Sequence, residues 1–305
     1  MNKFLLLFIL ILCLLISAFG RQPNNQKNGP IIVGILEDHN IFGSGDLEKF
    51  HVIRAVFKKT GANWYSLKDT FLNSDEKNRA PLHPIPEKID WHVCFDGKEI
   101  GIVKSMRYRG KYINGISNTG LFMPDAEKNA PIVGQRGDYF RGWVDDPIYR
   151  PLVLNTSPYY QDPEVWKPYV GTDEDLGLLK AKLQKQFRLF DRTPAKAKIT
   201  FLKSYQSQTN HAKILSIEVG NVDNVKTLPL DAATEEEHPR YSLTYFVDDG
   251  GIRYLFGSLT LIDAGDYDND GRDEFIFKYQ GYNYDGYLVY YNNCKQSAEF
   301  GWNYH

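Results

Sequence analysis

Short segments of β-branched and aromatic residues, separated by turn-forming residues, recur along most of this chain. Such segments favour strands, and breaks rich in glycine and aspartate favour hairpin turns, as at residues 248–251 and 284–286. The later segments are residues 199–204, 213–219, 241–247, 252–262, 274–279 and 287–291. The chain is therefore predicted to be mostly β.

The first half of the chain carries the same signals with more irregular spacing. Residues 31–36 predict a buried strand, and Asp96-Gly97 predicts a hairpin turn between residues 91–95 and 99–104. Residues 52–57 and 63–67 predict another hairpin. A helix over residues 46–59 competes with it, because Leu47, Phe50, Ile53 and Phe57 lie near one helical face. Residues 106–170 predict long loops with short strands, such as residues 151–154.

Residues 172–190 predict the one clear helix. Thr172 is a suitable N-cap, and Asp173 to Asp175 complement the positive end of the helix dipole. Leu176, Leu179, Leu183 and Phe187 form one apolar stripe. The fold expected is α+β but mostly β: a β-rich domain over residues 30–171, an amphipathic connecting helix over 172–192, and a second β domain over 193–305.

The N-terminus resembles a secretory signal peptide. Lys3 precedes an apolar run over residues 4–19, and Ala18 and Gly20 supply the small residues of a cleavage site, so residues 1–20 are expected to be removed. Residues 21–29 are polar and predict a flexible leader. No membrane-spanning segment is expected after cleavage, and the predicted location is secreted, either periplasmic or extracellular. Cys94 and Cys294 then remain, as one disulfide or as two buried thiols.

The net charge and the lack of familiar catalytic motifs argue against several classes of function. The net charge of −2 and the isoelectric point near 6.4 argue against a nucleic-acid partner. The sequence contains no zinc-protease, nucleophile-elbow, phosphate-loop or dinucleotide motif, and catalytic residues cannot be named from it. The histidines, His92 among them, offer only isolated acid–base candidates. A non-catalytic role is favoured.

The acidic run Asp266-Tyr267-Asp268-Asn269-Asp270-Gly271-Arg272-Asp273-Glu274 is the strongest functional signal. Calcium takes six to eight oxygen ligands, and alternate residues of a tight loop converge on one point. The expected ligands are the carboxylates of Asp266, Asp268, Asp270 and Glu274 and the carbonyl oxygen of Arg272. Gly271 permits the sharp turn, and Asp273 is expected to face away from the metal.

The segments around this loop exclude an EF-hand. An EF-hand needs a bidentate glutamate at position 12 and flanking helices, whereas this chain has Phe277 there and strand-like segments on both sides. Residues 264–274 instead resemble the calcium loop of FG-GAP/VCBS-type repeats, as found in integrin α-subunit propellers and secreted bacterial proteins. Those repeats occur in series, and this chain has one clear copy. The resemblance thus implies a strand–loop–strand calcium site more than a propeller.

Together these features predict an exported calcium-binding protein, either a binding module or a structural module of the envelope or extracellular space, with a protein or glycan partner. Two alternatives remain open. One is a secreted hydrolase with its site in the 106–170 loops or between the two domains. The other is a glycan-binding module that uses the tyrosine-rich C-terminal hairpin, which requires exposed Tyr282 and Tyr284.

Overall fold

The computed structural model describes residues 30–40, 49–67, 89–108, 124–126, 139–141, 147–158, 160–187, 198–220, 241–281 and 284–303. Over these residues the protein is mostly β, as predicted, with three larger antiparallel sheets and one α-helix. A two-stranded sheet joins β7 (Tyr139–Arg141) to β8 (Pro147–Tyr149). The predicted signal peptide 1–20 and leader 21–29 lie outside the described residues.

The N-terminal strands form a sheet whose pairings close on themselves, and we call it the closed sheet. Pairings run β1–β9–β4–β5–β6–β2, β2 returns to β1, and β3 extends from β2. The strands are β1 (Ile32–Asn40), β2 (Lys49–Thr60), β3 (Asn63–Ser66), β4 (Asp90–Phe95), β5 (Lys98–Tyr108), β6 (Pro124–Ala126) and β9 (Leu152–Asn155). Residues 49–60 are thus a strand, and the competing helix over 46–59 is wrong. The β1 backbone pairs with this segment from Lys49 to Lys58, which only an extended chain can do.

Both predicted hairpins of the closed sheet are confirmed. β2 pairs with β3 across a turn that contains Gly61 at φ 59°. β4 pairs with β5 across Asp96 and Gly97, whose φ angles of 49° and 74° fit a tight hairpin turn.

A second sheet carries the helix. Its strands are β10 (Trp166–Tyr169), β12 (Ser204–Ser207), β13 (Lys213–Gly220), β14 (Tyr241–Asp248) and β15 (Gly251–Phe256), with β11 (Lys198–Phe201) paired to β13. The helix α3 (Asp173–Phe187) begins as predicted. The Asp175 amide donates to Thr172 Oγ1, and Thr172 donates its own amide to Asp175 Oδ2. Leu179 and Leu183 pack on Leu215, Ile217 and Leu243 of the sheet.

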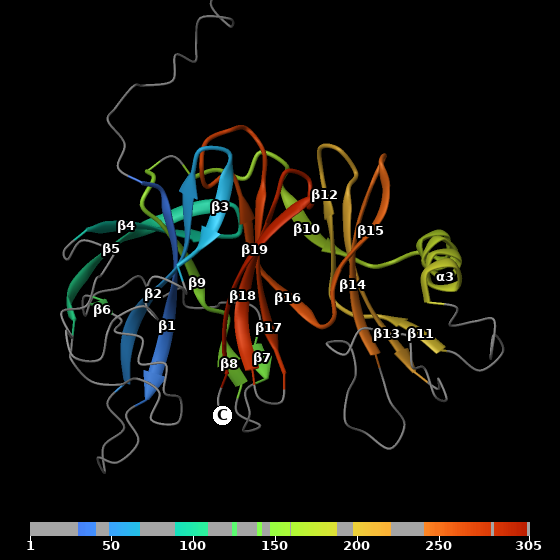
Figure 1. Ribbon diagram of the computed structural model, residues 1–305, viewed down its shortest axis with the longest axis horizontal. Helices are drawn as coiled ribbons and strands as arrows, with labels where there is room; N and C mark the ends of the chain where they lie inside the picture. The colour runs from blue at the N-terminus through green and yellow to red at the C-terminus, as the bar shows by residue number, and fades with distance from the viewer. Residues whose placement is uncertain are drawn as a thin grey trace, which may run out of the picture.

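The third sheet is a four-stranded meander in the order β16 (Leu259–Gly265), β17 (Glu274–Gln280), β18 (Tyr284–Tyr291) and β19 (Gln296–Asn303). Figure 1 shows it between the closed sheet and the second sheet, and we call it the central sheet. Two predictions fail here. Residues 252–262 form two strands in different sheets, and residues 284–286 lie in β18 instead of in a turn.

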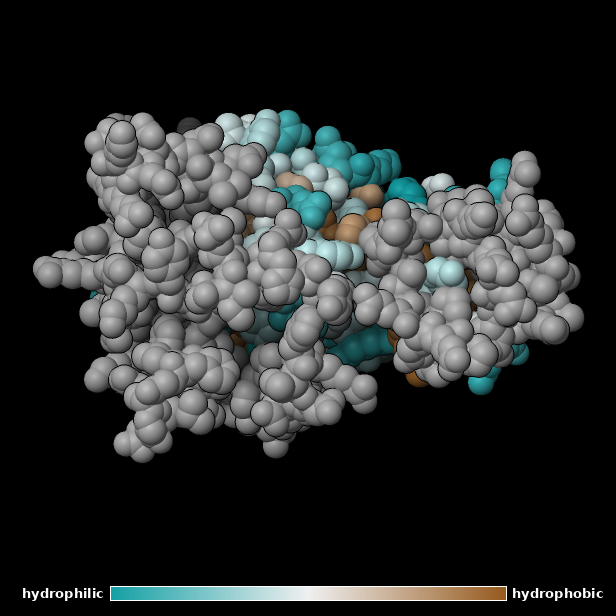
Figure 2. All heavy atoms as spheres, turned by 60° about the horizontal axis from the view of Figure 1, so that its bottom comes forward, coloured by the Kyte–Doolittle hydropathy of each residue, from teal (hydrophilic) through white to brown (hydrophobic). Residues whose placement is uncertain are grey.

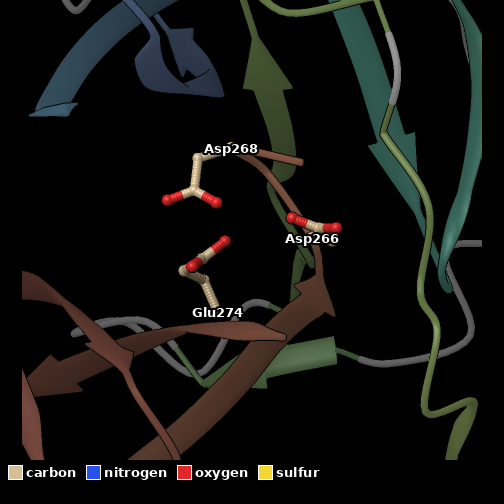
Figure 3. Close-up of side chains that lie close together, drawn as sticks. All are labelled: Asp266, Asp268 and Glu274. Atoms are coloured by element: carbon tan, nitrogen blue, oxygen red, sulfur yellow. The ribbon is translucent and has the colours of Figure 1, made fainter. Parts of the chain in front are cut away.

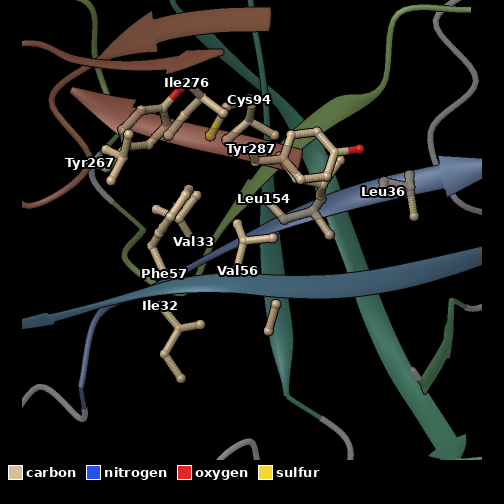
Figure 4. Packing of buried hydrophobic residues seen from close by; sticks show 14 of the residues in the cluster. Ile32, Val33, Leu36, Val56, Phe57, Cys94, Leu154, Tyr267, Ile276 and Tyr287 are labelled. Carbon is tan, nitrogen blue, oxygen red and sulfur yellow. The ribbon is translucent and has the colours of Figure 1, made fainter. Parts of the chain in front are cut away.

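Both faces of the central sheet are buried. Along β17, Ile276 faces the core of the closed sheet, whereas Phe275 and Phe277 face the second sheet. Tyr287 and Leu288 divide in the same way on β18, because neighbouring side chains of a strand point to opposite faces. Figure 4 shows Tyr267, Ile276 and Tyr287 against side chains of the closed sheet.

This packing bears on the predicted domain layout. The core of the closed sheet contains residues from both predicted domains, from Ile32 to Trp302. The helix α3 packs on one face of the second sheet, and the other face of this sheet shares a core with the central sheet. A division between residues 30–171 and 193–305 is therefore not visible in the packing of the described residues.

Cys94 and Cys294 are buried free thiols, which decides between the two alternatives left open by the sequence.

No helix within the described residues has the length and apolarity needed to cross a membrane. Among the coloured residues visible in Figure 2, most are hydrophilic, and a few hydrophobic ones lie between them.

Candidate metal centre

The acidic loop connects β16 to β17, and the hairpin itself brings its two ends together. Gly265 at the end of β16 pairs with Glu274 at the start of β17, so that Asp266, which follows Gly265, lies close to Glu274. The Asp266 amide donates to the carbonyl oxygen of Gln161 over 2.6 Å, which ties the loop to the segment before β10. The base of the loop is thereby fixed from two directions.

Asp266, Asp268 and Glu274 bring their carboxylates together. One oxygen of each lies within 4.8 Å of the others, and we call these residues the acidic triad. Figure 3 shows the three carboxylates around one point, with Asp268 and Glu274 facing each other. Asp266 and Glu274 are buried, and the Asp268 side chain is 4% exposed. Three carboxylates at this spacing, largely withdrawn from water, form a group that could hold a metal ion.

Backbone amides of the loop organise the first two carboxylates. Asp266 Oδ1 accepts from the Asp270 amide and Oδ2 from the Gly271 amide, over 2.9 and 2.8 Å. Asp268 Oδ1 also accepts from the Asp270 amide. Gly271 has φ 85°, which favours glycine, and the loop turns there as the sequence predicts.

Burial works against ionisation of two members of the triad, Asp266 and Glu274. It raises the pKa of Asp266 to about 6, and the nearby Asp268 carboxylate adds to the rise while amide hydrogen bonds oppose it. Burial also raises the pKa of Glu274 well above its usual range; Asp268 adds to this rise, and the Tyr267 amide and Lys59 oppose it. A bound cation would favour the ionised forms of both carboxyls.

Lys59 is the member of this site that local sequence patterns do not reveal. It lies near the end of β2, in a different sheet, and its ammonium contacts Asp268 Oδ2. Nothing in the spacing of residues near 59 signals a partner so distant in sequence. Only the packing of the central sheet against the closed sheet brings them together.

The other predicted ligands lie outside the triad. Asp270 is exposed, and its Oδ1 accepts from the Arg272 amide. The exposed Arg272 guanidinium donates to Asn292 Oδ1 over 3.1 Å. Asp273, which is not a predicted ligand and is expected to face away from the metal, accepts at its Oδ2 from the Trp166 indole, and its side chain is buried.

A further buried carboxyl lies close to the loop and was also missed. Asp263 follows a bulge in β16, and its Oδ2 accepts from the Tyr160 hydroxyl over 2.8 Å. Burial raises the pKa of Asp263 to about 7, and Arg150 opposes the rise. Asp263 and Arg150 line one small cavity together with Asp162. A bulge re-aims side chains, and strand periodicity alone does not predict where it falls.

The remaining sequence candidates that the structure describes lie in strands. His92 lies with its Nδ1 3.0 Å from Glu99 Oε1. Tyr279, Tyr287 and Tyr290 are buried core residues. Of the two tyrosines on which the glycan-binding alternative depends, Tyr284 is half-buried against the core and Tyr282 lies outside the described residues. Comparison with protein-family models, curated protein sequences and solved structures yields no match to this chain.

Proposed function

We propose that the protein is an exported calcium-binding module in which the metal has a structural, non-catalytic role. The convergence of the Asp266, Asp268 and Glu274 carboxylates carries this proposal. Asp270 and the carbonyl oxygen of Arg272 would complete the oxygen shell from the same loop. The resemblance of the loop to FG-GAP/VCBS repeats supports the same ligand set.

The chemistry of the donors favours calcium over softer metals. All of them are oxygens, and no cysteine or histidine belongs to the triad. Zinc and copper sites normally include nitrogen or sulfur ligands, whereas calcium prefers several carboxylates and carbonyl oxygens. A loop that supplies most ligands from its own backbone and side chains also suits the flexible coordination of calcium better than the strict octahedron of magnesium.

The surroundings of the loop support a clamping role. Asn155 of β9 donates to the Tyr267 carbonyl oxygen over 2.8 Å, and Asn269 donates to Ser157 Oγ over 3.0 Å. With the Gln161 contact, these bonds fasten the loop to the chain between β9 and β10. A cation at the triad would hold this junction together by neutralising its buried carboxylates.

The signal-peptide-like residues 1–20 support export, and the calcium concentration outside cells supports occupancy. Extracellular modules bind calcium with dissociation constants of about 10⁻⁴–10⁻³ M, and the calcium concentration outside cells is high enough to fill such sites. We take the partner to be a protein or a glycan, with the metal maintaining the surface that binds it.

Thermal unfolding tests this proposal. The Tm of the purified protein should rise by several degrees when chelator is replaced by millimolar calcium, because a ligand that binds only the folded state stabilises it by mass action. Magnesium at the same concentration should produce little change. An identical Tm in calcium and in chelator would overturn the proposal.

A further inference from the structure

The acidic triad already has a cation of the protein's own beside it. The Lys59 ammonium contacts Asp268 Oδ2, and the two side chains are only 13% and 4% exposed. This ion pair is therefore largely shielded from water. An exposed ion pair would be weak, because water and salt screen it. Its partner carboxylate is one of the three that the proposed calcium site requires.

Lys59 is held in place by aromatic rings from two sheets. Its ammonium lies 5.3 Å from the ring centroid of Trp64 in β3 and 5.7 Å from that of Tyr291 in β18. A cation within about 6 Å of an aromatic ring face is attracted by it. The Lys59 amide also donates to the Ile31 carbonyl oxygen, which fixes the backbone. The ammonium is thus directed to the triad by contacts that do not depend on a metal.

With all three carboxylates ionised, as calcium binding requires, and with one ammonium beside them, the site carries an excess of two negative charges. A calcium ion that enters the triad must approach the ammonium, share Asp268 with it, or displace it. Each course costs free energy that a site without the lysine would not lose, because like charges repel strongly where water is excluded.

We propose that Lys59 is the resident cation of the metal-free site, and that it competes with calcium for Asp268 and so weakens calcium binding. This inference rests on the proposed calcium site. In the absence of calcium Lys59 limits repulsion within the triad and ties the acidic loop to β2. When calcium binds, the metal takes over this role and the ammonium withdraws from Asp268.

Replacing Lys59 by methionine tests the inference. Methionine keeps an unbranched side chain against Trp64 and Tyr291 and removes only the charge. Lys58→Met is the matched control, because Lys58 is the preceding residue of β2 and points to the opposite face. For each protein, calcium affinity is measured by calorimetric titration with calcium chloride, and Tm is measured in chelator.

Lys59→Met should lower the calcium dissociation constant by about tenfold or more and should also lower the Tm in chelator. Lys58→Met should change neither appreciably. Equal calcium affinities for Lys59→Met and the unmodified protein would overturn the inference and leave the proposed function intact. Calcium binding by Lys59→Met alone would support the inference and overturn calcium binding as the function of the natural chain. A failure of both proteins to bind calcium would overturn both proposals.

Discussion

Trp166 donates its indole N–H to Asp273 Oδ2 over 2.9 Å, although the two residues are 107 positions apart in sequence. Asp273 and Glu274 are neighbours, yet they point to opposite faces of the hairpin, one toward Trp166 and one into the acidic triad. Burial raises the pKa of Asp273 to about 9, and Asp162 and Glu164 add to the rise. Two adjacent acidic residues therefore have different roles, one structural and one in the candidate metal centre.

Alanine substitutions should separate these roles. Asp268→Ala removes a triad carboxylate and should abolish the rise in Tm that calcium produces. Asp273→Ala leaves the buried Trp166 N–H without its acceptor and should lower the free energy of unfolding by about 1–3 kcal/mol, with or without calcium. The calcium-dependent rise should persist in Asp273→Ala. If it disappeared there as fully as in Asp268→Ala, the assignment of ligands within the loop would be wrong.

Asp263 should make stability depend on pH. Its pKa rises from 3.8 to about 7 on folding, so the folded state holds the proton more tightly than the unfolded state. The free energy of unfolding should therefore fall as pH rises from about 4 to about 7, by at most about 4 kcal/mol from this group, and its contribution should then stay constant. Asp263→Asn, which keeps an acceptor for Tyr160, should be less pH-sensitive over this interval. Denaturant unfolding in chelator at several pH values measures the difference, and parallel curves would refute it.

Asn155 should be a structural residue and not a glycosylation site. It begins the sequon Asn155-Thr156-Ser157, but its side chain is fully buried and donates to the Tyr267 carbonyl oxygen. Asn155→Ala should reduce the free energy of unfolding by about 1–3 kcal/mol, because a buried acceptor loses its donor. Mass spectrometry after expression in a glycosylating host should find residue 155 of the folded protein unmodified, and a glycan there would contradict this packing.

Two glycines should respond oppositely to alanine. A Cβ at Gly265 would lie 2.2 Å from the ring of Tyr160, which is buried, so Gly265→Ala should be strongly destabilising. A Cβ at Gly177, in α3, would meet nothing within 4 Å, and Gly177→Ala should raise the free energy of unfolding by up to about 1 kcal/mol. Urea unfolding of both variants tests the pair. A neutral Gly265→Ala would show that the strand and Tyr160 are not in close contact.

Features determined by local chemistry were predictable from the sequence. The Asp96-Gly97 turn and the Thr172 cap form because neighbouring residues satisfy one another, and both are where the sequence places them. The strand β19 was not predicted, although Ala298, Phe300 and Trp302 alternate with Glu299 and Gly301 as one face of a strand does. The break between β15 and β16 was also missed. Gly257 and Ser258 mark it in the sequence, but which sheet each half joins depends on packing.

The residues of the candidate metal centre also form two groups, those that could be predicted from the sequence and those that could not. Its acidic residues follow from the spacing within one loop, and three of them do converge. Lys59, Asp263 and the Trp166–Asp273 bond could not be predicted, because they depend on how sheets pack and where a strand bulges. Periodicity within a segment carries no information on either.

The shared core of the closed sheet and the central sheet has a consequence for synthesis of the chain. Of the described strands, the one that contains Ile32 leaves the ribosome first and the one that contains Trp302 last, yet both residues lie in one hydrophobic cluster. Until β16 to β19 have been made, the early strands have no partner for the face that those strands cover. Folding can therefore reach completion only after translation has passed Trp302, and the nascent chain must be kept from aggregating until then.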